Sequence, residues 1–199
     1  MRGLIKEKRT IDLNDVSRFS TNIFLLAILI FTLPFFLIWY GHITYFIFSS
    51  IDEVSFVVNL LINIFVFLVL LFVGIILHEL LHGGIWALFT KRGIKSIHIG
   101  MIKYPFFAPY CHCKEPLLIK HYILGAISPA FFLGVVPLIY AFVYGNLFIH
   151  IYGLFFFIAA AGDFMVVKLL LKEKNRNALV LDHPSELGYF IFIYKKPEE

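Results

Sequence analysis

The sequence has little of what a disulfide-bonded or secreted protein needs. Its 199 residues include only two cysteines, Cys111 and Cys113, and cysteines separated by one residue cannot build a disulfide framework. The first twenty residues carry five basic and three acidic side chains but no apolar core, so we expect no cleavable signal peptide. Internal repeats and low-complexity tracts are also absent from the sequence. These absences exclude a disulfide-stapled fold and a repeat architecture.

Charged residues are scarce too, at 15% of the chain, whereas 60% of the residues are hydrophobic. A soluble domain averages about 45–50% apolar residues, and phenylalanine alone occurs 24 times here. The composition therefore indicates a membrane protein, and the length allows a single polytopic membrane domain over residues 1–199. We expect contacts with membrane lipid and no nucleic-acid partner.

Four stretches are long and apolar enough to span a bilayer, which requires roughly 20 mainly apolar residues. They cover about 22–41, 56–89, 122–144 and 147–171. The second stretch is longer than a bilayer requires. It must therefore tilt, protrude, or break near Gly74 or Gly83-Gly84, and the sequence leaves these alternatives open.

The distribution of basic residues predicts the orientation of the spans. All 17 lysines and arginines lie in residues 1–20, in the 90–121 connection, or from Lys168 onward. The 42–55 connection and the turn at Gly145-Asn146 contain none. By the positive-inside rule, both termini and the 90–121 connection are cytoplasmic. We predict a multi-pass protein of the cell membrane.

The cytoplasmic segments have the composition of short strands. The 94–113 connection is rich in β-branched and aromatic residues, and the C-terminal tail reads ALVL, a turn-like DHPSELG, then YFIFIY. Such runs separated by turn residues favour strands. The expected fold is an all-α membrane protein of about four transmembrane helices, with a small cytoplasmic β-layer built from these two segments.

The second span contains the sequence GIILHELLHGG, in which His78-Glu79-Leu80-Leu81-His82 fits the pattern H-E-x-x-H. Residues i and i+4 share one face of a helix, so both imidazoles can bind one metal ion. Glu79 lies about 100° around the helix from His78, within reach of a metal-bound water. We predict His78 and His82 as metal ligands and Glu79 as the catalytic base.

A simpler alternative is a pair of buried histidines hydrogen-bonded to neighbouring helices, with Glu79 protonated or paired. Hydrocarbon does not solvate ionisable groups, so such residues within spans are rare and usually functional. Three of them at metal-site spacing favour the metal site.

The motif helix resembles that of intramembrane zinc metalloproteases of the site-2 protease type. The chain as a whole is similar to a family of small four-span membrane proteins described as zincin peptidases. The likeness includes HELLHG, then CKEPLLIKHYILGAISP at the third span, AAGD in the fourth, and DHPSELGYFIF in the tail. The resemblance implies a zinc-dependent metalloendopeptidase, a hydrolase that carries out intramembrane proteolysis.

Site-2 proteases take their third zinc ligand from an aspartate of a later span, which directs attention to Asp163. Asp163 and Glu79 are the two carboxylates within the predicted spans. Asp163 precedes Lys172 by nine residues, as His82 precedes Lys91. Asp163 and His82 should therefore lie at similar depths in the membrane. The small residues at 159–162 allow the close helix approach that a short aspartate side chain needs. We therefore predict His78, His82 and Asp163 as the Zn²⁺ ligands.

Other ligands fit less well. His121, at the membrane boundary, is the second choice for the third ligand, and Glu115 lies in a cytoplasmic connection. Asp163 could instead pair with Lys168, although five residues of spacing turn the two apart on a helix. The role of Cys111-His112-Cys113 stays open, because C-x-C with few other ligands is a poor zinc pattern.

The function predicted from the sequence is peptide-bond hydrolysis in membrane-associated proteins or peptides near the cytoplasmic face. His82 lies roughly 13 Å along a helix from Lys91, which puts the metal in the cytoplasmic half of the membrane. The alternative is a non-catalytic metal-binding membrane regulator or transporter accessory subunit.

Overall fold

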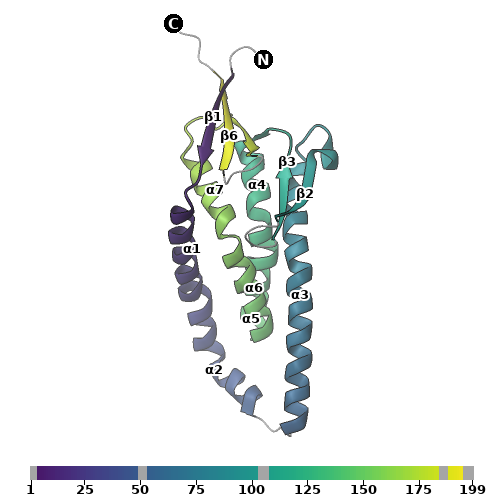
Figure 1. Cartoon of the computed structure of the whole chain (residues 1–199). Coiled ribbons are helices and arrows are strands. Elements are labelled where there is room, and N and C mark those ends of the chain that lie inside the picture. Colours follow the sequence, from purple (N-terminus) through teal and green to yellow (C-terminus); the bar gives the residue numbers. More distant parts are fainter. Residues whose placement is uncertain (1–3, 49–52, 103–107, 184–187, 195–199) are drawn as a thin grey trace.

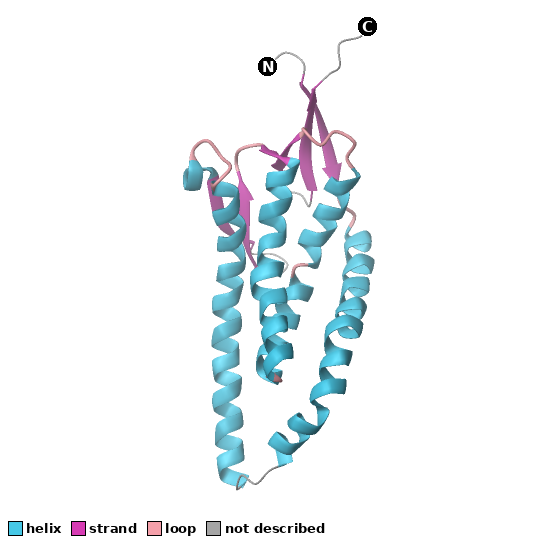
Figure 2. Cartoon of the chain, turned by 180° about the vertical axis from the view of Figure 1, so that it is seen from behind, coloured by secondary structure: helices cyan, strands magenta, loops and turns pink. Residues whose placement is uncertain are grey.

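The computed structural model is mostly helical and carries two small antiparallel sheets at one end (Figures 1 and 2). It describes residues 4–48, 53–102, 108–183 and 188–194. The helices run side by side along the long axis, and Leu4 and Tyr194, the first and last described residues, pair at the end that carries the sheets. The predicted fold class, long apolar helices with a small β-layer, is confirmed.

The helices account for most of the described chain. Their bounds are α1 Leu13–Ala27, η1 Ile28–Thr32, α2 Leu33–Phe48, α3 Glu53–Ala87, η2 Gly93–Ser96, α4 Ile119–Pro129, η3 Ala130–Val135, α5 Val136–Tyr144, α6 Leu147–Ala159 and α7 Ala161–Lys172. Three stretches, Leu13–Tyr45, Phe56–Ala87 and Ile119–Tyr144, are long and apolar enough to cross a membrane. The bent pair α6 and α7 makes a fourth if it is counted as one span.

Two proline residues explain why the first and third spans are not uniform α-helices. The π-helical turn η1 ends two residues before Pro34, and η3 ends two residues before Pro137. Proline has no backbone N–H and its ring clashes with the carbonyl four residues earlier. A π-helical turn relieves this clash without ending the helix, so the first span continues past Pro34 and the third past Pro137.

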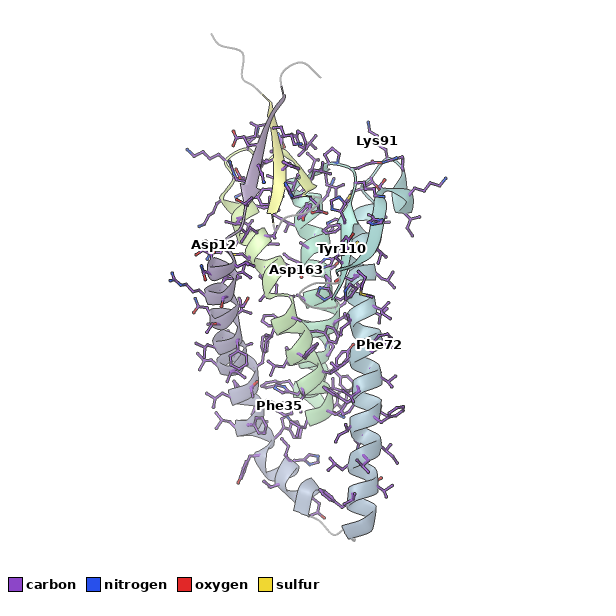
Figure 3. All side chains as sticks on the ribbon, in the orientation of Figure 1. Asp12, Phe35, Phe72, Lys91, Tyr110 and Asp163 are labelled. Atoms are coloured by element: carbon purple, nitrogen blue, oxygen red, sulfur yellow. The ribbon has the colours of Figure 1, made fainter. Side chains whose placement is uncertain are left out.

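Helix α3 resolves the question of the long second span. It runs without a break through Gly74 and Gly83 for 35 residues, or about 52 Å, which exceeds the roughly 30 Å of a hydrocarbon core. Phe72 and most of its neighbours between positions 56 and 77 point away from the other helices (Figure 3). The break occurs instead in the fourth segment, where α6 and α7 meet at 45°.

The strands form two separate sheets. Their bounds are β1 Leu4–Thr10, β2 Ile97–Ile102, β3 Ala108–Cys113, β4 Leu117–Leu118, β5 Leu179–Asp182 and β6 Gly188–Tyr194. One sheet has the order β1-β6-β5-β4, and the other is the β2–β3 hairpin. Both segments expected to contribute strands do so, as the antiparallel pairs β2–β3 and β5–β6. Strands β1 and β4 were not predicted; β1 is largely charged, as suits a sheet edge.

The core lies where the sheets meet the helices. Its buried apolar side chains come from the end of α3, from α4 and α7, and from β3 to β6. They include Trp86, Tyr122, Leu170, Val180 and Ile191. This cluster fixes the sheet ends of α3, α4 and α7 relative to one another, and the predicted site residues lie just below it.

Candidate metal centre

The predicted ligands come from two helices. His78 and His82 are one turn apart on α3, and Asp163 is the third residue of α7. The bend at Ala160 starts α7 at a new angle, and Gly162 has no neighbour that a side chain would meet. Figure 3 shows Asp163 inside the bundle, below the four-stranded sheet. The helix change at Ala160 thus turns the aspartate toward α3.

The three side chains meet at short distances. His78 Nε2 lies 3.4 Å from Asp163 Oδ2, and His82 Nε2 lies 3.4 Å from Asp163 Oδ1. The two Nε2 atoms are 3.2 Å apart. One ligand atom from each residue lies within 4.8 Å of the others, and the His82 side chain is only 6% exposed. The three ligands that the sequence predicts are therefore brought together.

The hydrogen bond on the far side of His82 sets its tautomer. His82 Nδ1 lies 2.9 Å from the carbonyl oxygen of Gly125, and a carbonyl only accepts, so Nδ1 carries the proton. In the neutral imidazole, Nε2 then directs its lone pair into the space between Asp163 and His78, where a metal ion would bind. A second-sphere carbonyl that orients the ring in this way is the usual arrangement for a metal-binding histidine.

The spacings fit a zinc ion. Zinc bonds to histidine nitrogen and carboxylate oxygen are about 2.0–2.2 Å long, so a tetrahedral centre separates its ligand atoms by about 3.3–3.6 Å. The two Nε2 atoms, 3.2 Å apart, are close to this range, as is the 3.4 Å from each of them to a different oxygen of Asp163. With one atom taken from each residue, the three ligand atoms lie within 4.8 Å of one another. Two imidazoles and one carboxylate also leave a fourth position for water or substrate.

A stack of rings supports His82 from the sheet side. Trp86 stacks on His82 with a centroid separation of 5.3 Å, and Tyr122 stacks on Trp86 at 5.0 Å. Trp86 Nε1 donates to the carbonyl oxygen of Tyr122 at 3.0 Å. Trp86 fills the space that a side chain at position 125 would need, because a Cβ on Gly125 would lie 2.2 Å from Trp86 Nε1. Glycine at this position therefore lets α4 approach the motif helix.

Glu79 lies beside the ligand group and faces the β2–β3 hairpin. The backbone N–H of Cys111 on β3 hydrogen-bonds to its carboxylate. The hairpin can come this close because Gly83 has no side chain; a Cβ there would lie 2.8 Å from Ile97 Cγ2 and 3.0 Å from Cys111 Sγ. Sequence reasoning placed the hairpin in the cytoplasmic layer but did not predict its contact with Glu79.

The alternative ligands lie elsewhere. His121 stacks on Phe89 at 4.0 Å, outside the ligand group. Lys168 does not pair with Asp163; its Nζ lies 4.7 Å from the ring centroid of Phe19. Glu115 accepts hydrogen bonds from the N–H of Lys91, from Arg92 and from Ser96. These three donors hold the pKa of Glu115 at about 2.

The Cys111-His112-Cys113 segment forms part of β3 and does not form a metal-ligand group within the residues that the structure describes. Cys113 Sγ donates to the carbonyl oxygen of Glu115 at 3.2 Å. Burial raises the pKa of Cys111 to about 12, and the nearby Glu79 and Asp182 carboxylates add to this effect. Burial also raises the pKa of Cys113 to about 11, so both cysteines are thiols at neutral pH.

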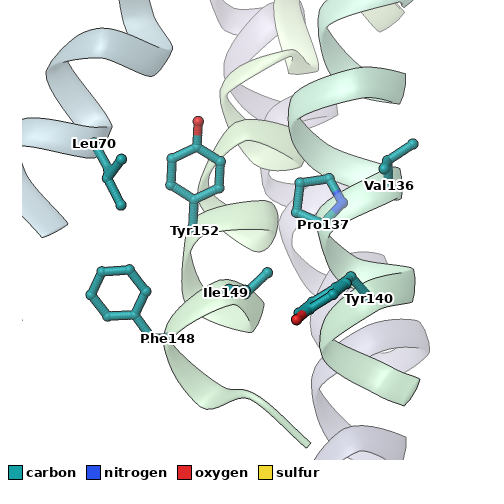
Figure 4. Close-up of a pocket in the computed structure, with 7 residues that line it drawn as sticks. All are labelled: Leu70, Val136, Pro137, Tyr140, Phe148, Ile149 and Tyr152. Atoms are coloured by element: carbon teal, nitrogen blue, oxygen red, sulfur yellow. The ribbon is translucent and has the colours of Figure 1, made fainter. Parts of the chain in front are cut away.

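An apolar groove lies away from this chemistry. It has a volume of ≈ 370 Å³ and opens between α3, α5 and α6 (Figure 4). Leu70, Pro137 and Tyr152 are among its lining residues. Leu70 is two turns, about 12 Å, from His78 on the same helix, and Gly74 between them packs against Phe156 and Tyr152. The groove carries no metal-ligating side chain.

Comparison with known proteins adds the family. No curated protein and no solved structure matches the chain. Residues 71–178 match the model of a family described as "Putative zincin peptidase". The match includes the H-E-x-x-H end of α3, the hairpin and α4 to α7, and so contains His78, His82 and Asp163. Because the matched segment covers more than half of the 199 residues, the chain belongs to this zincin peptidase family, whose name implies zinc.

Proposed function

We propose that the protein is a membrane-embedded zinc metallopeptidase that hydrolyses peptide bonds of membrane-associated proteins near the cytoplasmic face. In this proposal, His78, His82 and Asp163 hold Zn²⁺, and Glu79 is the general base. The observation that carries the proposal is the convergence of His78, His82 and Asp163, whose ligand atoms, one from each residue, lie within 4.8 Å of one another. Membership of the zincin peptidase family supports it.

The chemistry needs an acid–base group next to the ligands. Zinc, when bound, supplies a Lewis acid that polarises the scissile carbonyl and lowers the pKa of water towards about 7. Glu79 takes the proton from the attacking water and passes it to the leaving amine. The N–H of Cys111 holds the carboxylate of Glu79, which limits its rotation and keeps it oriented between water and leaving group.

Metal analysis tests the ligand assignment. Purified wild-type protein should contain one zinc per chain, and Asp163→Ala should lose zinc and activity together. His121→Ala is the matched control and should keep both, because His121 stacks on Phe89 away from the ligands. Folded Asp163→Ala with full zinc occupancy would refute the ligand set. A zinc-free wild type would indicate that His82 holds its contact with Asp163 through a proton instead.

Turnover is tested separately through Glu79. Glu79→Gln should retain zinc, since its side chain is not a ligand, but should cleave nothing. Comparing membrane proteomes of cells with wild type and Glu79→Gln should reveal substrates that accumulate uncut in the variant. Identical proteomes, together with one zinc per chain, would favour the non-catalytic metal-binding regulator or transporter accessory subunit.

A further inference from the structure

The carboxylate of Asp182 joins three elements that surround the metal centre. Asp182 is the last residue of β5, and its side chain is 13% exposed. It accepts a hydrogen bond from the N–H of Cys113 on β3 at 2.8 Å and another from the hydroxyl of Tyr122 on α4. His112 Nδ1 lies 3.6 Å away. Asp182 therefore ties the four-stranded sheet to the separate β2–β3 hairpin.

The two carboxylates Asp182 and Glu79 occupy consecutive positions along one edge of β3. Alternate residues of a strand direct their N–H groups to the same edge. Cys113 donates to Asp182, and Cys111, two residues earlier, donates to Glu79. The bond that Asp182 makes thus sets the position of the strand that holds Glu79.

The contact between hairpin and motif helix depends on this position. Cys111 Sγ and Ile97 lie against Gly83, one residue after the ligand His82. Within the described residues, Asp182 is the one side chain that bonds β3 to β5. Tyr122, the second donor to Asp182, is the ring that stacks on Trp86 above His82. Movement of Asp182 would therefore release the hairpin, whereas Trp86 keeps its own hydrogen bond to the Tyr122 carbonyl and stays on His82.

We propose that Asp182 is a positioning residue, which fixes the β2–β3 hairpin on α3 so that the Cys111 N–H orients the Glu79 carboxylate. The inference rests on the proposed function for its effect on catalysis. Its structural part, the attachment of the hairpin to α3, does not depend on that function. Asp182 lies outside the segment that matches the family.

The first test is alkylation of Cys111 by N-ethylmaleimide, resolved from Cys113 by fragment mass spectrometry. Asp182→Ala removes the acceptor for Cys113 and Tyr122, and should speed alkylation of Cys111 by about 10- to 100-fold through local opening of the hairpin. Asp182→Asn keeps an acceptor oxygen for the Cys113 N–H, and its NH₂ group can donate to the Tyr122 hydroxyl oxygen, so it should stay near the wild-type rate. Zinc content should equal that of the wild type in both variants.

Glu173→Ala is the matched control. Glu173 accepts from Arg9 and from Tyr189, so the change removes another carboxylate bridge to the same sheet without touching β3. Its Cys111 alkylation should equal that of the wild type. An unchanged rate in folded Asp182→Ala, or an equal rise in Glu173→Ala, would overturn the inference. Loss of zinc from folded Asp182→Ala would also overturn it, because Asp182 would then support the ligands themselves.

The second test uses cells and the membrane proteins that accumulate uncut with Glu79→Gln. Asp182→Ala should lower the ratio of cut to uncut chains about 10- to 100-fold, whereas Asp182→Asn and Glu173→Ala should leave it near the wild-type value. If wild type cuts nothing while Asp182→Ala exposes Cys111, the proposed function fails and the hairpin attachment stands. If wild type cuts and Asp182→Ala cuts equally well, the inference fails and the function stands.

Discussion

Gly83 and Gly84 offer a paired test of the packing between the motif helix and the hairpin. A Cβ at Gly83 would lie 2.8 Å from Ile97 Cγ2 and 3.0 Å from Cys111 Sγ, whereas a Cβ at Gly84 would meet nothing within 4 Å. Both residues lie within α3. Replacing either by alanine should therefore give the same gain in helix propensity, about 0.5–1 kcal/mol.

The steric cost falls on Gly83 alone. Ile97 is β-branched, so its Cγ2 cannot turn away without a change of the stiff χ1 rotamer, and overpacking of this kind costs about 1–3 kcal/mol. The difference in unfolding free energy between Gly83→Ala and Gly84→Ala should therefore be about 1–3 kcal/mol. For a chain of this length, that difference corresponds to roughly 2–12 °C in Tm.

Thermal unfolding of the two variants in the same detergent measures this difference. Gly84→Ala should melt at or above the wild-type temperature, and Gly83→Ala below Gly84→Ala. Alkylation of Cys111 should accelerate only in Gly83→Ala, because only this variant pushes the hairpin off α3. Equal melting temperatures and equal alkylation rates for the two variants would refute the close contact between hairpin and helix.

Three further predictions concern titration, thiol reactivity and topology. The pKa of Glu115 is about 2 in the folded protein, against an ordinary value of 4.5, so its stabilising effect is complete above pH 4.5 and is lost as pH falls toward 2. Glu115→Gln should remove this part of the pH dependence of Tm in the zinc-free protein. Identical pH profiles for wild type and variant would contradict the Arg92–Glu115 bridge. With a pKa of about 12, Cys111 has a thiolate fraction of ~10⁻⁴ at pH 8. Its alkylation should therefore be about a thousand-fold slower in the folded than in the unfolded chain. Similar rates in the two states would show that the thiol is not buried. Reporter fusions after Tyr144 and after Lys196 should report opposite sides of the membrane, with the second cytoplasmic, and finding both on one side would disprove the four-span topology.

Much of the candidate site could be predicted because its signals are local. The spacing of His78 and His82 follows from helix geometry alone. The depth of Asp163 follows from counting residues to the next lysine on a second helix, and its oxygens lie 3.4 Å from both imidazoles. Whether zinc binds there stays a prediction.

The missed features depend on contacts between distant parts of the chain. β1 pairs with β6 across almost the full sequence, from Leu4 with Tyr194 to Thr10 with Gly188, and its charged residues mask any alternating apolar pattern. Asp182 meets Tyr122 and Cys113, which lie 60 and 69 residues away. No local pattern identifies a carboxylate whose partners are a distant hydroxyl and a backbone N–H.

The start of the first helix was also missed. The apolar stretch begins near residue 22, but α1 begins at Leu13, where the Asp12 side chain accepts from the N–H of Asn14 and caps the helix. The first turns of α1 are polar, and hydropathy therefore locates the membrane-crossing part of the helix but not its N-terminus. The capping signal, an aspartate before the first helical residue, was available in the sequence.

The outer edge of β3 also bears on how other polypeptides can approach this end of the molecule. An edge strand ordinarily presents unpaired N–H groups on which a foreign strand can build. Along this edge, Pro109 has no N–H, and the N–H groups of Cys111 and Cys113 are taken by Glu79 and Asp182. An incoming strand therefore finds no vacant donor between Pro109 and Cys113. By occupying these N–H groups, the two carboxylates prevent a further strand from pairing with β3 and so prevent aggregation through this edge.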